Sequence, residues 1–248
     1  MKTESPFTRK ISLDETNINL NSDIDIKNLN IEEYIINERN HLKDFIVKNP
    51  YFAKTLEPYK LKSESNNNEE IPKIIKLMIE AANIAKVGPT ATIAGTISEL
   101  TLDYLIKNGS KYSIVDNGGD IAFLNNYDEK KVVFGIYAGD SPLSGKIGLE
   151  FKGRKNQTFG ICSSSASVGY SLSYGRSDSV TVIASQASIA DGLATSIGNK
   201  VNGKLDKTAV ENGLEFAEEF KEHFIGVLII VGETIGTIGK FPKIVETK

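Results

Sequence analysis

The segment "KYSIVDNGGDIAFL" (residues 111–124) gives the clearest local indication of the fold. Apolar, β-prone residues lie on both sides of an Asn-Gly-Gly-Asp sequence. Two adjacent glycines between such runs are typical of a tight hairpin, because glycine tolerates the positive φ angles that the turn requires. The segment therefore predicts two antiparallel strands joined by Gly118 and Gly119.

Two helices are predicted immediately upstream of this hairpin. Pro72 suits the first turn of a helix that ends at Gly88, and Pro89 can begin a second helix that runs to about Lys107. The residues expected on their buried faces are Ile74, Ile75, Met78, Ala81, Ala82 and Ala85 in the first and Ile93, Ile97, Leu100, Tyr104 and Leu105 in the second.

The rest of the chain alternates strand and helix patterns. The predicted strands cover residues 9–23 (two short strands), 130–139, 145–153, 177–185 and 226–241 (a hairpin). The other predicted helices cover residues 31–49, 185–199 and 208–222. Antiparallel groups of strands with helices between them predict an α+β fold.

We expect a single domain over residues 1–248. Within it, an N-terminal subregion (1–62) and a polar connector (62–70) precede a core (71–248) that holds the residues of chemical interest. The segments "ATIAG" (91–95) and "ASIAD" (187–191) agree at three of five positions, and each stands at a predicted helix start. This similarity raises the alternative of an internal duplication.

The composition of the chain argues against several classes of partner. The 248 residues are 40% hydrophobic and 25% charged, which is typical of a globular protein, and the formal net charge of -3 argues against a nucleic-acid partner. The one cysteine, Cys162, cannot form an internal disulfide. The first residues lack the apolar run of a signal peptide, and no segment is long and apolar enough to span a bilayer. We therefore expect a cytoplasmic protein without a membrane partner; the sequence does not indicate its oligomeric state.

Three segments rich in small residues are candidates for a ligand site: residues 87–95, 115–123 and 188–198. Small residues let the backbone approach a ligand, and the free amides of a helix start can hold a phosphate. The structural alternative for each is a tight turn or a closely packed helix.

Asp191 and Thr195 are four residues apart, so they share one face of the predicted helix. A carboxylate and a hydroxyl there can bind a hard cation such as Mg²⁺. The alternative is an acid near its own helix N-terminus, stabilised by the helix dipole alone. No His/Cys cluster suggests zinc, and His41 and His223 are expected to be surface or packing residues.

The stretch "GICSSSASVGYSLSYG" (160–175) is rich in Ser and Gly. Its hydroxyls and amides could line an anion or a carbohydrate-like ligand, or the stretch could be a solvated loop. Cys162 has no histidine nearby in sequence that would activate it as a nucleophile.

Taken in order, these segments resemble the ApbE family, the FAD:protein FMN transferases. That family has a Gly and then an acid on a helix, an N-x-G-G-D-I turn, and a late V-T-V…A-D-A-L-A-T element. The matching residues are Gly95 and Glu99, then Gly118 to Ile121, then Asp191 to Thr195. The resemblance covers residues 87–124 and 177–199, under a third of the chain.

The resemblance implies an ApbE-like α+β fold, a magnesium site and a flavin ligand. Asp191 and Thr195 would hold Mg²⁺ together with the carbonyl of Ala91. FMN would pass from FAD to a Thr or Ser hydroxyl of an acceptor protein. No catalytic side chain is indicated. The implied cofactor-binding residues are Ala91, Thr92, Glu99, Asn117, Gly118, Gly119 and Asp120.

The chain departs from the family pattern in four places. Ala94 stands where the family has Lys, Gly88 where it often has Asp, and Glu99 where it has Asp. The family's H-x-x-D-P-x-x-G segment is replaced by "SSSASVGYSLSYGRSD" (163–178). The departures indicate an archaeal-type branch of the ApbE-like superfamily. They leave two alternatives to FMN transfer: a non-catalytic flavin- or nucleotide-binding protein, or an archaeal-type cofactor-pathway enzyme acting on another phosphorylated small molecule.

Overall fold

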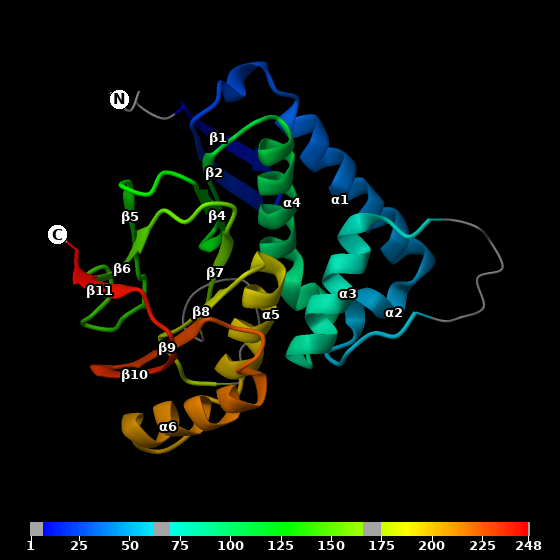
Figure 1. Ribbon diagram of the computed structural model, residues 1–248. Coiled ribbons are helices and arrows are strands. Elements are labelled where there is room, and N and C mark those ends of the chain that lie inside the picture. The colour runs from blue at the N-terminus through cyan, green and yellow to red at the C-terminus, as the bar shows by residue number, and fades with distance from the viewer. Residues whose placement is uncertain (1–6, 62–69, 166–174, 248) are drawn as a thin grey trace.

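The computed structural model describes residues 7–61, 70–165 and 175–247. Its centre is an eight-stranded antiparallel sheet with the order β1-β2-β3-β4-β7-β8-β9-β10 (Figure 1). Helices cover one face, and a three-stranded antiparallel sheet, β11-β6-β5, covers part of the other. The predicted α+β class with antiparallel sheets is confirmed.

The elements have the following bounds. The strands of the large sheet are β1 (Phe7–Leu13), β2 (Thr16–Ser22), β3 (Tyr112–Asn117), β4 (Asp120–Asn125), β7 (Thr158–Ser164), β8 (Ser179–Ala184), β9 (Gly226–Val231) and β10 (Thr234–Gly239). The strands of the small sheet are β5 (Lys131–Gly135), β6 (Ile147–Lys152) and β11 (Lys243–Glu246). The α-helices are α1 (Ile31–Lys48), α2 (Pro50–Lys54), α3 (Lys73–Ala85), α4 (Ile93–Lys107), α5 (Ala187–Gly198) and α6 (Asp206–Ala217). The 3-10 helices are η1 (Ile26–Asn28), η2 (Pro89–Thr92) and η3 (Glu218–Phe220).

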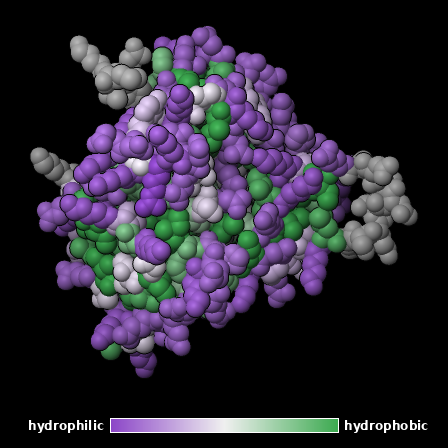
Figure 2. All heavy atoms as spheres, viewed as in Figure 1, coloured by the Kyte–Doolittle hydropathy of each residue, from purple (hydrophilic) through white to green (hydrophobic). Residues whose placement is uncertain are grey.

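Two hydrophobic cores lie on the two faces of the large sheet. The first, between sheet and helices, draws on side chains from Ile11 to Val231. The second, between the two sheets, is built around aromatic rings, with the centroids of Phe123 and Phe134 5.1 Å apart. Strands β8 and β9 are buried along their whole length because both of their faces are covered, which explains their continuous apolar sequences. The outer surface seen in Figure 2 is largely hydrophilic, with hydrophobic groups over the small sheet.

Helix α5 lies in the middle of the helical layer, where its small residues permit close packing. A Cβ atom on Gly192 would lie 3.0 Å from the Cβ of Ala85 in α3. A Cβ atom on Gly95 in α4 would lie 2.3 Å from the carbonyl oxygen of Ala187 in α5. The small residues of these segments therefore set how closely the helices approach.

The predicted hairpin at the Asn-Gly-Gly-Asp sequence is confirmed. Gly118 and Gly119 have φ angles of 67° and 103°, which other residues rarely adopt. Both glycines are exposed, and nothing lies within 4 Å of a Cβ built on either. The turn is therefore an open tip between β3 and β4.

Three sequence expectations need correction. Helix α3 ends at Ala85, and its C-cap is Lys86 in the left-handed conformation (φ 58°) rather than Gly88. Gly88 is required for a different reason, since a Cβ there would lie 2.0 Å from the carbonyl oxygen of Thr55. Residues 160–164, the start of the stretch that was expected to be a loop, belong to strand β7, because pairing with β4 and β8 satisfies the backbone of this Ser-containing segment.

The last correction concerns short elements that the sequence did not reveal. Helix α2 begins at Pro50, where only an end of helix α1 was expected, and β11 completes the small sheet. Residues 62–69, most of the predicted polar connector, lie outside the described part of the chain.

The order hairpin, helices, hairpin occurs twice along the large sheet. β1-β2 and β3-β4 flank the helices that end in α4, and β7-β8 and β9-β10 flank α5 and α6. The segments "ATIAG" and "ASIAD" stand at the starts of α4 and α5. The predicted internal duplication stays a prediction.

Candidate functional site

Helices α4 and α5 cap each other through carboxylates. The backbone amide of Gly95 donates to Asp191 Oδ2 at 2.8 Å. Gly95 is the third residue of α4, so this amide has no acceptor within its own helix. In return, Glu99 Oε2 accepts from the backbone amide of Ser188 (3.0 Å) and its hydroxyl (2.7 Å), and Glu99 Oε1 accepts from Gln186 Nε2 (3.2 Å).

This arrangement corrects the structural alternative considered for Asp191. The first turn of α5 contains no acidic residue, and Asp191 is the fifth residue of that helix. Its carboxylate therefore stabilises the start of α4 rather than the start of its own helix.

The accessible face of α5 consists of two residues. Ten of the twelve residues of α5 are buried, and the two that are half-buried are Asp191 and Thr195. Because they are four residues apart, they lie on the same side of the helix. The residues predicted as a cation-binding pair thus form the one side of α5 that is not sealed by packing.

The β3–β4 hairpin brings a second carboxylate, Asp120, to the same place. The Ser98 hydroxyl in α4 donates to the carbonyl oxygen of Asp120 at 2.7 Å. The thiol of Cys162 and the backbone amide of Ser163 lie near the Asp120 carboxylate and favour its ionised form. Its Oδ1 atom is nevertheless buried without a hydrogen-bond partner. An orphaned buried carboxylate oxygen is costly unless a proton or a cation neutralises it.

Burial and mutual repulsion raise the pKa of both carboxyl groups. Burial raises the pKa of Asp120 to about 7, and the Asp116 charge adds to the shift, while hydrogen bonds from Cys162 and Ser163 oppose it. Burial, followed by the Asp120 charge, raises the pKa of Asp191 well above its usual range, against the opposing hydrogen bond from Gly95. Two close carboxylates that resist ionisation together suit a site that receives a divalent cation.

Three other predicted site residues, Asn117, Thr92 and Ala91, are held by hydrogen bonds or by packing near the start of α4. Asn117 Nδ2 donates to the carbonyl oxygen of Ala94 (3.3 Å), and Asn117 Oδ1 accepts from the backbone amide of Asn17 (3.2 Å). The Thr92 hydroxyl donates to the carbonyl oxygen of Pro89. Ala91 is half-buried in η2 and packs against the first core. The polar groups of Asn117 and Thr92 thus hold the start of α4.

The sequence did not identify the residues that surround Asp120. Cys162 lies in β7, with its Sγ 3.3 Å from the carbonyl oxygen of Ala187, and burial raises the pKa of its thiol well above the usual range, so it is no nucleophile. Asp116 Oδ1 accepts from the Gly119 amide at 2.8 Å and so fixes the turn. The similarity of "ATIAG" and "ASIAD" was the one available signal that the two helix starts meet.

The Ser-rich stretch 161–176 is only partly described. Residues 161–164 belong to β7, and residues 166–174 lie outside the described part of the chain, so a role for them in ligand binding stays a prediction. His41 and His223 are exposed, as expected. Among the described residues, no group of three or more His, Cys, Asp or Glu could hold a metal ion, and no helix is long and apolar enough to cross a membrane.

A pocket of about 310 Å³ opens beside the start of α5. Glu99, Gln186, Thr158 and Lys73 are among the residues that line it. The Glu99 carboxylate already accepts the hydrogen bond of the Ser188 amide. The charge of Lys73 is paired with Asp103, whose Oδ2 lies 2.5 Å from Lys73 Nζ. A phosphate is therefore disfavoured at the start of α5, where it would meet a carboxylate.

Comparisons with known proteins agree with this architecture. The model of a family described as "AbpE bacteria" matches residues 4–237. A UPF0280 protein of Methanobrevibacter smithii is 48% identical over 238 residues, which cover 96% of this chain and 95% of the relative. A UPF0280 protein of Methanothermobacter thermautotrophicus is 47% identical and covers 96% of this chain and 88% of its own.

Solved structures show the same fold at low sequence identity. The flavin transferase ApbE of Vibrio cholerae matches with a TM-score of 0.58 and 13% identity over 95% of this chain and 97% of its own. The Pseudomonas stutzeri flavinyl transferase ApbE, in its apo form, matches with a TM-score of 0.56 and 11% identity over 97% of this chain and 96% of its own. The ApbE-like fold expected from the short motifs is thus shared along nearly the whole chain.

Proposed function

The chain belongs to the family described as "AbpE bacteria", within the ApbE-like superfamily. We propose that it binds FAD with Mg²⁺ and transfers FMN to a Thr or Ser hydroxyl of an acceptor protein. The acceptor oxygen would bond to the phosphorus of the FMN half and lose its proton to solvent, and AMP would leave with the electrons of the broken P–O bond. We further propose that a single ApbE-like domain carries this function.

One observation carries the proposal. The half-buried pair Asp191 and Thr195 is the one open side of α5, and it lies beside Asp120, whose Oδ1 has no hydrogen-bond partner. Mg²⁺ in nucleotide enzymes is held by one or two carboxylates plus waters and phosphate oxygens. The donor set of two carboxylates and a hydroxyl fits that requirement.

Each residue would have a defined role. Asp191 and Thr195 would hold the ion together with the Ala91 carbonyl, as the family pattern implies, and Asp120 would supply the second carboxylate. A bound Mg²⁺ would neutralise the charge that develops on the pyrophosphate during transfer. The exposed glycines of the β3–β4 turn would allow the backbone to approach the nucleotide. Glu99, whose carboxylate is engaged by α5, would keep that helix in place.

A second function is non-catalytic binding of flavin or another nucleotide. It is favoured by the replacement of the family's H-x-x-D-P-x-x-G segment with residues 163–178, because a site without that segment could bind the nucleotide and lack the means to transfer FMN. The third candidate, an archaeal-type cofactor-pathway enzyme, would use the same ion with another phosphorylated small molecule.

The three functions separate in one experiment. Purified protein is incubated with FAD, with Mg²⁺ or with EDTA, and bound flavin is measured by absorbance and released AMP by chromatography. Flavin transfer requires Mg²⁺-dependent release of AMP. Flavin that is retained without release of AMP would support the binding protein, and Mg²⁺ binding without any flavin binding would support the third candidate.

A further inference from the structure

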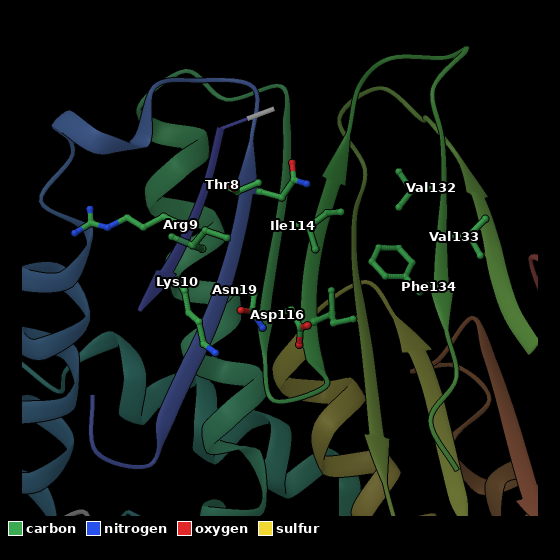
Figure 3. Close-up of a pocket in the computed structure, with 12 residues that line it drawn as sticks. Thr8, Arg9, Lys10, Asn19, Ile114, Asp116, Val132, Val133 and Phe134 are labelled. Carbon is green, nitrogen blue, oxygen red and sulfur yellow. The ribbon is translucent and has the colours of Figure 1, made fainter. Parts of the chain in front are cut away.

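A larger pocket lies on the opposite face of the large sheet from Asp120 and Asp191. It has a volume of about 530 Å³ and opens between the outer faces of β1, β2 and β3 and strand β5 of the small sheet (Figure 3). Nothing in the proposed transfer reaction accounts for it. Its volume is in the range of small-molecule sites.

Two rows of side chains form the floor of this pocket, because residues paired across antiparallel strands share one face. The strand register gives the first row as Thr8, Asn21 and Ile114. It gives the second row as Lys10, Asn19, Asp116 and Ile121. The rows are polar on β1 and β2 and become apolar toward β4.

The apolar end continues into the second core. Val132 and Phe134 of β5 close this end, and the Phe134 ring contacts the ring of Phe123. In Figure 3 these side chains face the pocket from the strand opposite Ile114. A ligand in this pocket therefore meets hydrocarbon at one end and amide groups at the other.

The charges in the pocket nearly cancel. Lys10 and Asp116 lie on the same row and have opposite charges. The Arg9 guanidinium points away from the pocket, toward Glu32, with Nη2 2.9 Å from Glu32 Oε1 (Figure 3). A pyrophosphate would find no excess of positive charge here, so an uncharged ligand is favoured.

The polar end has an unsatisfied hydrogen-bonding group. Asn21 Oδ1 is buried without a hydrogen-bond partner, although the residue lines the pocket. A buried amide oxygen without a partner is rare in native proteins, and a ligand that donates a hydrogen bond would satisfy it.

We propose that this pocket binds an uncharged, planar fused heterocycle with one apolar end and one imide-like end, such as the ring system of a flavin. The apolar ring would lie between Ile114 and Phe134, and the imide edge would face Asn19 and Asn21. The inference rests on the proposed function only for the choice of a flavin as the probe. Asp116 and Ile121 flank the turn that carries Asp120, so the pocket and the cation site would use opposite faces of one hairpin.

The test uses riboflavin, which has the ring system but no phosphate. Riboflavin fluorescence is titrated with the full chain in EDTA, so that no metal contributes, and competition is measured with inorganic pyrophosphate. The variant is Asn21→Leu, and the matched control is Asn17→Leu, which changes an exposed asparagine on the same face of β2 outside the pocket.

We expect riboflavin to bind the parent and Asn17→Leu equally, without displacement by pyrophosphate. Asn21→Leu should weaken binding about tenfold or more, because the imide edge loses its partner. Should Asn21→Leu also lower Tm, Asn19→Leu at an exposed position gives the same measurement.

Three results would overturn the inference: no saturable riboflavin binding by the parent, binding by Asn21→Leu and Asn19→Leu as tight as that of the parent and Asn17→Leu, or displacement of riboflavin by pyrophosphate. Each is distinguishable from failure of the proposed transfer, which is read from Mg²⁺-dependent release of AMP from FAD.

Discussion

Helices α4 and α5 occupy corresponding places in the two hairpin–helix–hairpin runs of the large sheet, but they contribute different chemistry where they cross. The carboxylate of Glu99 in α4 accepts from three donors, all at the start of α5. The carboxylate of Asp191 in α5 accepts from Gly95 and faces a second acid, Asp120. A carboxylate offers about four acceptor positions, so Glu99 is nearly saturated whereas Asp191 keeps capacity for a cation. One cap is structural, and the other is the candidate site.

The largest effect on stability is expected when the two helices are forced apart. In Gly95→Ala the new Cβ would lie 2.3 Å from the carbonyl oxygen of Ala187 and 2.7 Å from the Cβ of Asp191. We expect the free energy of unfolding to fall by about 3 kcal/mol, since backbone must shift. Urea denaturation followed by circular dichroism measures this. Gly135→Ala is the control, because nothing lies within 4 Å of its Cβ, and it should be nearly neutral. Equal stability of the two variants would mean that the helix crossing tolerates a methyl group.

Removing the charge of Asp191 should weaken Mg²⁺-dependent binding with little effect on stability. Asp191→Asn keeps an oxygen that can accept from Gly95, but it loses the anionic donor, so Mg²⁺-dependent FAD binding should weaken about 10–100-fold. Stability without ligand should change little or rise, since the acid is costly in its buried place. Calorimetric titration with Mg²⁺, with and without FAD, measures the effect.

Glu99→Gln is the matched control for the other helix. It should cost about 1 kcal/mol of stability by weakening the cap of α5, and it should leave the Mg²⁺ dependence unchanged. If Asp191→Asn retains the parent's Mg²⁺ dependence, the two caps are equivalent and the cation site is elsewhere.

The pH dependence of the free energy of unfolding measures the cost of ionising Asp120 in the folded chain. Burial raises the pKa of Asp120 from 3.8 to about 7 in the folded chain. The stabilisation from its bound proton is fully present below about pH 4 and is lost as pH rises through about 7. In EDTA, between about pH 5.5 and about pH 8, the parent should lose roughly 1–2 kcal/mol more stability than Asp120→Asn. Thermal unfolding across this range measures the difference. If the stability of the parent and of Asp120→Asn changes equally with pH, Asp120 does not have a raised pKa in the folded chain.

At the tip of the β3–β4 hairpin, only a small loss of stability is expected, together with a loss of ligand binding. Gly119 has a φ angle of 103°, so Gly119→Val should cost about 1 kcal/mol of stability and abolish flavin or nucleotide binding. Gly109→Val is the control, because Gly109 has a similar φ angle (94°), has nothing within 4 Å of a Cβ built on it and lies outside the candidate site. Fluorescence titration with FAD compares the two. If Gly119→Val binds FAD as well as the parent, the turn is only structural.

Local patterns identified most elements, for a physical reason that is visible at particular residues. The β3–β4 hairpin depends on two glycines that adopt positive φ, and α3 depends on apolar residues at helical spacing, so both are encoded within a short stretch. Strand β7 was misjudged because its Ser and Gly composition resembles a loop. Its partners β4 and β8 begin 38 residues before and 21 residues after its own start, and only their hydrogen bonds make it a strand.

The hairpin and the shared helix face of Asp191 and Thr195 could be predicted from the sequence alone, because each follows from residues close together in the chain. The α+β class followed from the order of such local elements. The contacts of those residues could be known only from the folded chain. Asp191 meets an amide 96 residues away, and Asp120 is buried beside Cys162. The folded chain also shows that Asn21 faces a pocket closed by β5. These contacts join segments far apart in the chain, and no local periodicity encodes which helix start or sheet face will be brought against another.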